Sequence, residues 1–184
     1  PPLTMEEAKV TILVELEQPV EKLFLEFGPP VAAASVAQVH RAQTTQGEDV
    51  AVKILRPRIE KRFAADIDSF AFAARTIEFF SKAGRRLKPV ESVKMLEASM
   101  KLELDLRMEA SAADEIRQNS KEDPGFRIPK VNWERTGKRV LTTEWIDAIP
   151  MADVEALRRA GFDLHRLADN LIQSFLRHAI RDGF

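Results

Sequence analysis

Two apolar segments between residues 31 and 55 restrict the fold more than any other part of the chain. Both are rich in valine, and a polar, glycine-containing gap at residues 44–48 separates them. A gap of this kind between apolar segments is typical of a β-hairpin. The second segment alternates strictly, so its β-branched residues share one face of a strand and Lys53 lies on the other face.

The tetrapeptide Val50-Ala51-Val52-Lys53 resembles the V-A-I-K sequence of the third strand of protein kinases. A lysine at mid-strand can reach phosphate groups, and the small Ala51 on the same face leaves room for a flat adenine. A lysine on an edge strand that faces solvent would give the same letters, and short motifs often occur by chance. The tetrapeptide alone leaves both interpretations open.

Alanines occupy the upstream positions where a kinase phosphate loop carries glycines. In the pattern G-x-G-x-x-G-x-V, Ala32, Ala34 and Ala37 take the glycine places, Val39 takes the valine place, and Ser35 lies at the tip. Alanine disfavours positive φ and keeps a phosphate farther from the backbone than glycine does. The nucleotide is therefore expected to sit differently here than in a protein kinase.

A phosphate-binding lysine needs a carboxylate partner, and the helix predicted from Pro89 to about residue 120 offers three. Glu103 follows apolar residues at three and seven positions, which places it on an inward stripe. Asp105 and Glu109 share another face at i, i+4. The alternative is a solvated helix in which Glu103 pairs with Arg107.

The rest of the chain is predicted to be mainly helical, which gives an α+β fold with an antiparallel sheet and inserted long helices. A capping box at Thr4 and Glu7 starts a helix that should stop before Pro19. The type of segment 20–27, which Gly28-Pro29-Pro30 closes, stays open. The later elements are expected as a helix at 59–82, short strands at 130–133 and 139–146, and two helices after Pro150.

Composition excludes several kinds of site. The chain has no cysteine, which rules out disulfides and thiolate chemistry, and a net charge of −1 argues against a nucleic-acid binder. No apolar run approaches the ~20 residues of a membrane helix. The three histidines, His40, His165 and His178, lack metal-ligand spacing, which favours structural or surface roles.

Taken together, four segments resemble the UbiB family, a group of atypical protein-kinase-like proteins linked to ubiquinone biosynthesis. They are Ala-Ala-Ala-Ser-Val-Ala-Gln-Val-His (32–40), Val-Ala-Val-Lys-Ile-Leu-Arg-Pro (50–57), Glu-Leu-Asp with Glu109-Ala110 (103–110) and Leu-Thr-Thr-Glu-Trp-Ile (141–146). The final Arg-Asp-Gly-Phe (181–184) resembles the residues just before the family's catalytic loop.

The resemblance implies a role for each matching residue. Lys53 would contact the phosphates, with Glu103 as its likeliest partner and Glu109 as the rival, and Glu103 and Asp105 would form the family's E-x-D motif. The other nucleotide contacts implied are the loop residues Ala32, Ala33, Ala34 and Ser35, the pocket residues Val39 and Ala51, the gatekeeper Thr143, and the hinge residues Glu144 and Ile146.

The resemblance also implies an organisation. Residues 1–146 would form a kinase-like small lobe with a helical insertion, and residues 147–184 would begin the helical large lobe. Both ends are expected to be cut ends: the K-x-G-Q segment, the catalytic loop and the D-F-G metal ligands would lie outside the chain, which alone would be inactive. No metal ligand is assigned within it.

The implied function is ATP or ADP binding with Mg²⁺ in an atypical kinase or ATPase that supports ubiquinone biosynthesis. The full-length bacterial protein would lie at the cytoplasmic side of a membrane, with quinone-biosynthesis proteins or lipid precursors as partners. Two alternatives stay open. One is a regulatory pseudokinase module without phosphoryl transfer. The other is a helical interaction domain with an accidental motif, in which Lys53 would face solvent away from Glu103 and Glu109.

Overall fold

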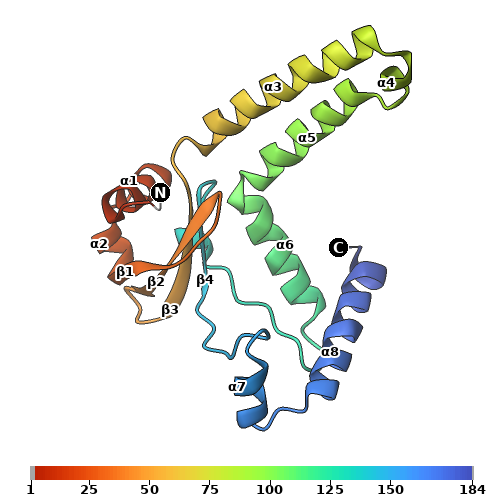
Figure 1. Cartoon of the computed structure of the whole chain (residues 1–184). Helices are drawn as coiled ribbons and strands as arrows, with labels where there is room; N and C mark the ends of the chain where they lie inside the picture. Colours follow the sequence, from red (N-terminus) through yellow and green to blue (C-terminus); the bar gives the residue numbers. More distant parts are fainter. Residues whose placement is uncertain (1–2, 184) are drawn as a thin grey trace.

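A computed structural model describes residues 3–183, which form an antiparallel sheet flanked by helices (Figure 1). Within that range the sheet has four strands in the order β1-β2-β3-β4: β1 (Phe24–Ala33), β2 (Ala37–Thr44), β3 (Asp49–Leu55) and β4 (Val140–Glu144). The predicted hairpin is the β2–β3 pair, and the predicted α+β fold with inserted helices is confirmed.

Helices precede the sheet, interrupt it between β3 and β4, and follow it (Figure 1). They are α1 (Met5–Leu16), α2 (Val20–Leu23), α3 (Ile59–Phe80), α4 (Lys82–Arg86), α5 (Pro89–Glu103), α6 (Leu106–Asn119), α7 (Val154–Arg159) and α8 (Leu164–Arg177), with short turns η1 (Trp133–Arg135) and η2 (His178–Asp182). The predicted capping box is present: Thr4 Oγ1 accepts from the Glu7 amide, and Glu7 accepts from the Thr4 amide.

The two faces of the sheet enter two separate cores. On one face Val50, Val52 and Ile54 of β3 pack against α1 and α2, and all three are at most 3% exposed. On the other face Leu55 joins Leu141 and the apolar side of α6. The strict alternation of β3 therefore decides which layer each side chain joins, and it leaves Lys53 on the face toward α6.

The prediction that Gly28-Pro29-Pro30 closes the segment before the hairpin is wrong, because β1 runs through these residues. An edge strand needs backbone hydrogen bonds on one side only, so it tolerates proline. β1 is an edge strand, and its register with β2 shifts between Phe27 and Pro30 and again before Ala32. The two prolines therefore lie where the β1–β2 pairing is irregular, and the strand continues past them.

The prediction of one helix from Pro89 to about residue 120 is also wrong, because the chain breaks between α5 and α6. Leu104 and Leu106 are both buried in the core beneath Leu55. In a continuous helix, residues two apart point in widely different directions. The break lets both leucines enter one core, and Asp105 caps α6 by accepting from the Arg107 amide at 3.1 Å.

The predicted strand at 130–133 is reduced to a single bridge between Val131 and Thr143, followed by η1. Arg135 at the end of η1 is 5% exposed. Its guanidinium donates to Leu23 O, Thr45 Oγ1 and Gln46 Oε1 at 2.8–3.0 Å. The turn at residues 133–135 thus places the Arg135 guanidinium where it connects η1 with α2 and with the β2–β3 turn.

On the sheet face that packs against α1 and α2, His40 belongs to a buried polar network. Its Nδ1–H donates to Gly28 O at 2.9 Å, and its Nε2 accepts from the Gln38 amide at 3.1 Å. Gln38 cannot reverse its amide without losing both of its bonds to the Leu3 backbone. The arrangement suits a neutral imidazole, because a protonated Nε2–H would face the Gln38 N–H group.

Burial lowers the pKa of His40, and its bond to the Gly28 carbonyl offsets this in part. The unfolded chain therefore binds a proton more readily as the pH falls through the ordinary histidine value of about 6.5. We expect the free energy of unfolding to decrease on going from about pH 7.5 to about pH 5.5, as measured by urea titration.

His40→Asn, which keeps a donor to Gly28 O, should lose this part of the pH dependence. The control is His165→Asn, since His165 is exposed on α8 and should keep the wild-type slope. Equal slopes for His40→Asn and wild type would contradict the assignment of a buried, neutral His40.

The two helices predicted after Pro150 are confirmed as α7 and α8. The turn η2, which directly follows α8, docks on α6 near the C-terminus of the chain (Figure 1). There Arg181 donates to Asp123 at 3.0 Å and to the Asn119 carbonyl, and it holds the pKa of Asp123 below the usual value. Phe184, the last residue of the 181–184 match, lies outside the described residues.

Candidate nucleotide site

Cross-strand pairing brings five of the predicted nucleotide contacts together on one face of the sheet. Ala33 and Glu144 lie in rows of the other face, where they pair with Gln38 and Val50. Lys53 pairs with Val39 on one side and Leu141 on the other, and Val39 pairs with Ala32. Directly paired residues share a face, so these four form one row across the strands. In the next row Ala51 pairs with Thr143. The small Ala51 thus lies between the lysine and the start of the hinge segment.

Glu109 of α6 is the carboxylate partner of Lys53. The lysine Nζ donates to both carboxylate oxygens of Glu109, at 2.8 and 2.6 Å. The prediction that Glu103 would be the preferred partner is wrong, because the helix break leaves Glu103 exposed as the last residue of α5. The interaction-domain alternative required Lys53 to lie away from both acids, and this pairing contradicts it.

The ion pair is half exposed, since the side chains of Lys53 and Glu109 keep 32% and 49% of their accessible surface. Pairs at this exposure contribute only about 0–1 kcal/mol to stability. Its main effect is therefore geometric: the carboxylate fixes the direction of the lysine ammonium over the open side of the sheet.

Asp105 acts as the N-cap of α6, and within residues 3–183 it forms no hydrogen bond or ion pair with Lys53. Its carboxylate pairs with the Arg107 guanidinium at 2.6 and 2.9 Å, which holds the Asp105 pKa below its usual value. Arg107 is thereby engaged by Asp105 and not by Glu103, contrary to the solvated-helix alternative. The roles predicted for Glu103 and Asp105 as an E-x-D motif stay predictions.

Arg56 donates hydrogen bonds to the turn between β1 and β2, and it was not predicted from the sequence. Within the alanine loop, the Ala34 amide donates to Ala37 O at 2.8 Å. Arg56 donates from Nε to Ala34 O at 3.0 Å and from its amide to Val36 O at 2.9 Å. Its place three residues after Lys53 offered a signal, because β3 runs antiparallel to β2 and ends beside the loop.

The hinge segment after β4 is tied to its surroundings. The Glu144 amide donates to Lys130 O at 2.8 Å, and its carboxylate pairs with Arg127, which lowers the Glu144 pKa. The Trp145 amide donates to Asp49 O. The Ile146 amide forms no hydrogen bond with any other residue of the described range 3–183.

The site is an open sheet face and not an enclosed cavity. A cavity of about 790 Å³ lies on the far side of the hinge, where Asp49, Trp133 and Glu144 line it. Another of about 700 Å³ lies between α3 and α5. Neither includes Lys53. A nucleotide at Lys53 would need further protein on the side opposite the sheet to become enclosed.

The part of the chain that the structure describes holds neither a metal-binding cluster nor a membrane-spanning helix. No group of three or more histidine, aspartate or glutamate side chains between residues 3 and 183 could hold a metal ion. No helix in that range combines the length and apolar character needed to cross a membrane.

Comparison with known proteins places this geometry in a family. The family model of the ABC1 atypical kinase-like domain matches residues 1–184. The chain is 42% identical to a probable protein kinase UbiB of Marinobacter nauticus and 38% identical to one of Pseudomonas aeruginosa. Each match covers 100% of this chain and 34% or 35% of the relative, so the chain spans about a third of the length of these proteins.

A solved structure gives the same result at the level of the fold. It is described as the complex of Rv3197 with erythromycin from Mycobacterium tuberculosis, and it matches 90% of this chain and 41% of its own with a TM-score of 0.74 at 28% identity. The resemblance inferred from the sequence motifs is confirmed, and the chain belongs to the ABC1 atypical kinase-like family, to which the UbiB proteins belong.

Proposed function

We propose that this chain is the ATP-binding part of a UbiB-type atypical kinase or ATPase that supports ubiquinone biosynthesis. The observation that carries the proposal is the Lys53–Glu109 ion pair, which lies beside Ala51 on an open sheet face. Residues 1–146 would be the small lobe and residues 147–184 the start of the large lobe. Partners would be quinone-biosynthesis proteins or lipid precursors, at the cytoplasmic side of a membrane.

Each residue of the site has a task that its position allows. Lys53 Nζ donates to phosphate oxygens, and Glu109 holds it in place. The adenine lies against Val39 and Ala51, with Thr143 at the back and the backbone of Glu144 and Ile146 along its edge. The loop Ala32–Ser35 covers the phosphates. A bound Mg²⁺ would neutralise phosphate charge, and its ligands would come from outside residues 3–183.

The second candidate is a regulatory pseudokinase module, in which ATP occupancy sets conformation without phosphoryl transfer. The observation that favours it is the alanine loop, since each Cβ keeps the backbone farther from the phosphates than glycine would. The two functions differ in one measurement. A chain extended to the length of its relatives should hydrolyse ATP under the first proposal and only bind it under the second.

Ala34→Gly tests the position of the phosphates. Removal of the Cβ lets phosphate oxygens approach the loop, while added backbone freedom opposes ordering by about 0.5–1 kcal/mol. We expect the affinity for ATP or ADP to change by roughly threefold or more, measured with a fluorescent nucleotide analogue and unlabelled competitors. Ala83→Gly, an exposed helical alanine at the tip of the α3–α5 hairpin, is the matched control. Unchanged affinities for both nucleotides would remove the loop from the site.

A further inference from the structure

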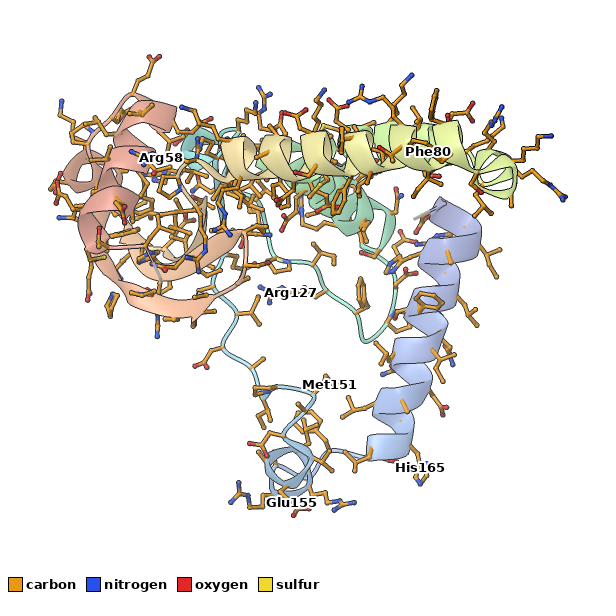
Figure 2. The ribbon with its side chains drawn as sticks, turned by 45° about the horizontal axis from the view of Figure 1, so that its top comes forward. Arg58, Phe80, Arg127, Met151, Glu155 and His165 are labelled. Atoms are coloured by element: carbon orange, nitrogen blue, oxygen red, sulfur yellow. The ribbon has the colours of Figure 1, made fainter. Side chains whose placement is uncertain are left out.

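The helices α3, α4 and α5 form a hairpin that extends away from the sheet (Figure 1). Figure 2 shows Arg58 at the base of this hairpin and Phe80 near its far end. Large apolar side chains at that end are among the most exposed in residues 3–183: Phe72 at 71%, Phe79 at 76%, Phe80 at 80% and Leu87 at 78%. We call Phe72, Phe79 and Phe80, together with the connector Ser81–Lys88 that contains Leu87, the hairpin tip.

The aromatic residues of the tip do not belong to the contact between the two helices. Ile67 and Ala74, seven residues apart, are the buried residues in the middle of α3, and Ile67 lines the cavity between α3 and α5. Phe72 and Phe79 are also seven apart, but they are offset from the first pair by five residues, or roughly 140° around the helix. The two phenylalanines therefore point outward, and helix packing does not explain them.

Phe79 and Phe80 also contact each other. Their ring centroids lie 4.9 Å apart with the planes at 84°, which is an edge-to-face pair. The pair forms a compact apolar wedge at the end of α3. A wedge that projects from an extended hairpin can enter a surface that is soft and broad, as a lipid headgroup layer is.

Basic residues surround this wedge. Residues 75–94 contain six basic side chains and two acidic ones, in a chain whose net charge is −1. Both acids are engaged: Glu78 accepts from the Val90 amide, and Glu91 pairs with Lys88 at 3.1 Å. The positive surplus is thus concentrated at the end of the molecule that carries the exposed phenylalanines.

We propose that the hairpin tip is a docking surface for an anionic membrane. Phe79, Phe80 and Leu87 enter the headgroup region, while Arg85 and Arg86 contact lipid phosphates. The inference names the surface for the membrane contact proposed above and rests on that part of the proposed function, but it does not depend on nucleotide binding. Aromatic and basic side chains together favour lipid over a protein groove, because they match both the apolar and the anionic layers of a leaflet.

Vesicle co-sedimentation of the purified chain tests the proposal. We expect binding to phosphatidylcholine vesicles that contain about 30% phosphatidylglycerol, weaker binding to phosphatidylcholine alone, and loss of binding between about 0.1 M and about 0.5 M salt. The double variants Phe79→Ser/Phe80→Ser and Arg85→Gln/Arg86→Gln should each lower the partition coefficient by about tenfold or more. All four side chains are exposed, and thermal melting by circular dichroism verifies that the variants fold.

Matched controls separate the tip from other exposed surfaces. Leu171→Ser/Phe175→Ser removes two exposed apolar residues of α8, and Arg158→Gln/Arg159→Gln removes two exposed basic residues of α7. Neither should change vesicle binding by more than about twofold. Loss of vesicle binding in the α8 control, with no loss in the tip variants, would overturn the proposal. It would mean that α8, and not the hairpin tip, contacts the membrane.

A fluorescence experiment places the tip in the bilayer. Phe79→Trp should show a blue-shifted emission and quenching by brominated lipids, above the background of Trp133 and Trp145. Phe175→Trp should show neither change. Emission that stays unshifted on anionic vesicles, or self-association through Phe79 and Phe80 seen by light scattering without vesicles, would favour a protein partner and overturn the proposal.

Discussion

Glu109→Gln is expected to weaken ATP binding by at least about tenfold and to leave the fold intact. The carboxylate of Glu109 receives two charge-assisted hydrogen bonds from Lys53, at 2.6 and 2.8 Å. Hydrogen bonds to charged groups are worth about 1.5–3 kcal/mol, which corresponds to a tenfold to hundredfold change in an equilibrium constant. Because the pair is half exposed, the free energy of unfolding should fall by less than about 1 kcal/mol.

Glu115→Gln is the control, since it removes the same charge from the same helix. Glu115 is exposed on α6, and the ion pair of Lys53 is with Glu109. Nucleotide titrations of the two variants and wild type, with melting curves for each, provide the comparison. Lys53→Met should abolish ATP hydrolysis in a chain extended to the length of its relatives.

Two results would contradict this assignment. Equal losses for Glu115→Gln and Glu109→Gln would mean that general charge, and not the contact with Lys53, governs nucleotide binding. Retained hydrolysis in Lys53→Met would remove Lys53 from the phosphate site.

Arg135→Met is expected to cost the largest amount of stability of any variant considered, about 3 kcal/mol in the free energy of unfolding. The guanidinium is buried and donates to Leu23 O, Thr45 Oγ1 and Gln46 Oε1. Methionine fills much of the volume but leaves the Leu23 carbonyl without this donor. A lysine ammonium cannot donate to all three acceptors in the planar geometry of the guanidinium. Arg135→Lys should therefore lose a large part of the same stability, measured as the free energy of unfolding.

Urea titration of the chain measures this effect, with Arg159→Met as the control because Arg159 is exposed on α7. The control should change the free energy of unfolding by less than about 0.5 kcal/mol. If Arg135→Met were as stable as Arg159→Met, the connection between α2, the β2–β3 turn and η1 would not contribute to folding.

The features that local chemistry controls could be predicted from the sequence. The capping box at Thr4 and the faces of β3 follow from side-chain types and a period of two, and both are present. The break at Leu104 and Leu106 could not be predicted this way, because it depends on a core that forms only when α6 meets the sheet. Helical spacing alone placed Glu103 inward and so selected the wrong partner for Lys53.

The site was predictable where a motif described one strand, and less so where distant segments meet. Lys53 and Ala51 share a face, as the alternation indicated. Arg56 was missed because its importance lies in hydrogen bonds to the backbone carbonyls of Ala34 and Val36, which no side-chain pattern records. Gln38 was missed for a similar reason, since its bonds run to the backbone of Leu3.

The late position of β4 has a consequence for how the chain acquires its structure. Strands β1, β2 and β3 are neighbours in sequence and can pair as soon as they are made, whereas Val140 of β4 pairs with Ile54 only after the whole helical insertion. Closing a loop of roughly 85 residues costs on the order of 4 kcal/mol in chain entropy, although a preformed α3–α5 hairpin shortens the loop. The addition of β4 should therefore be the slow step of folding, and until it occurs β3 is an unpaired edge at which aggregation can begin.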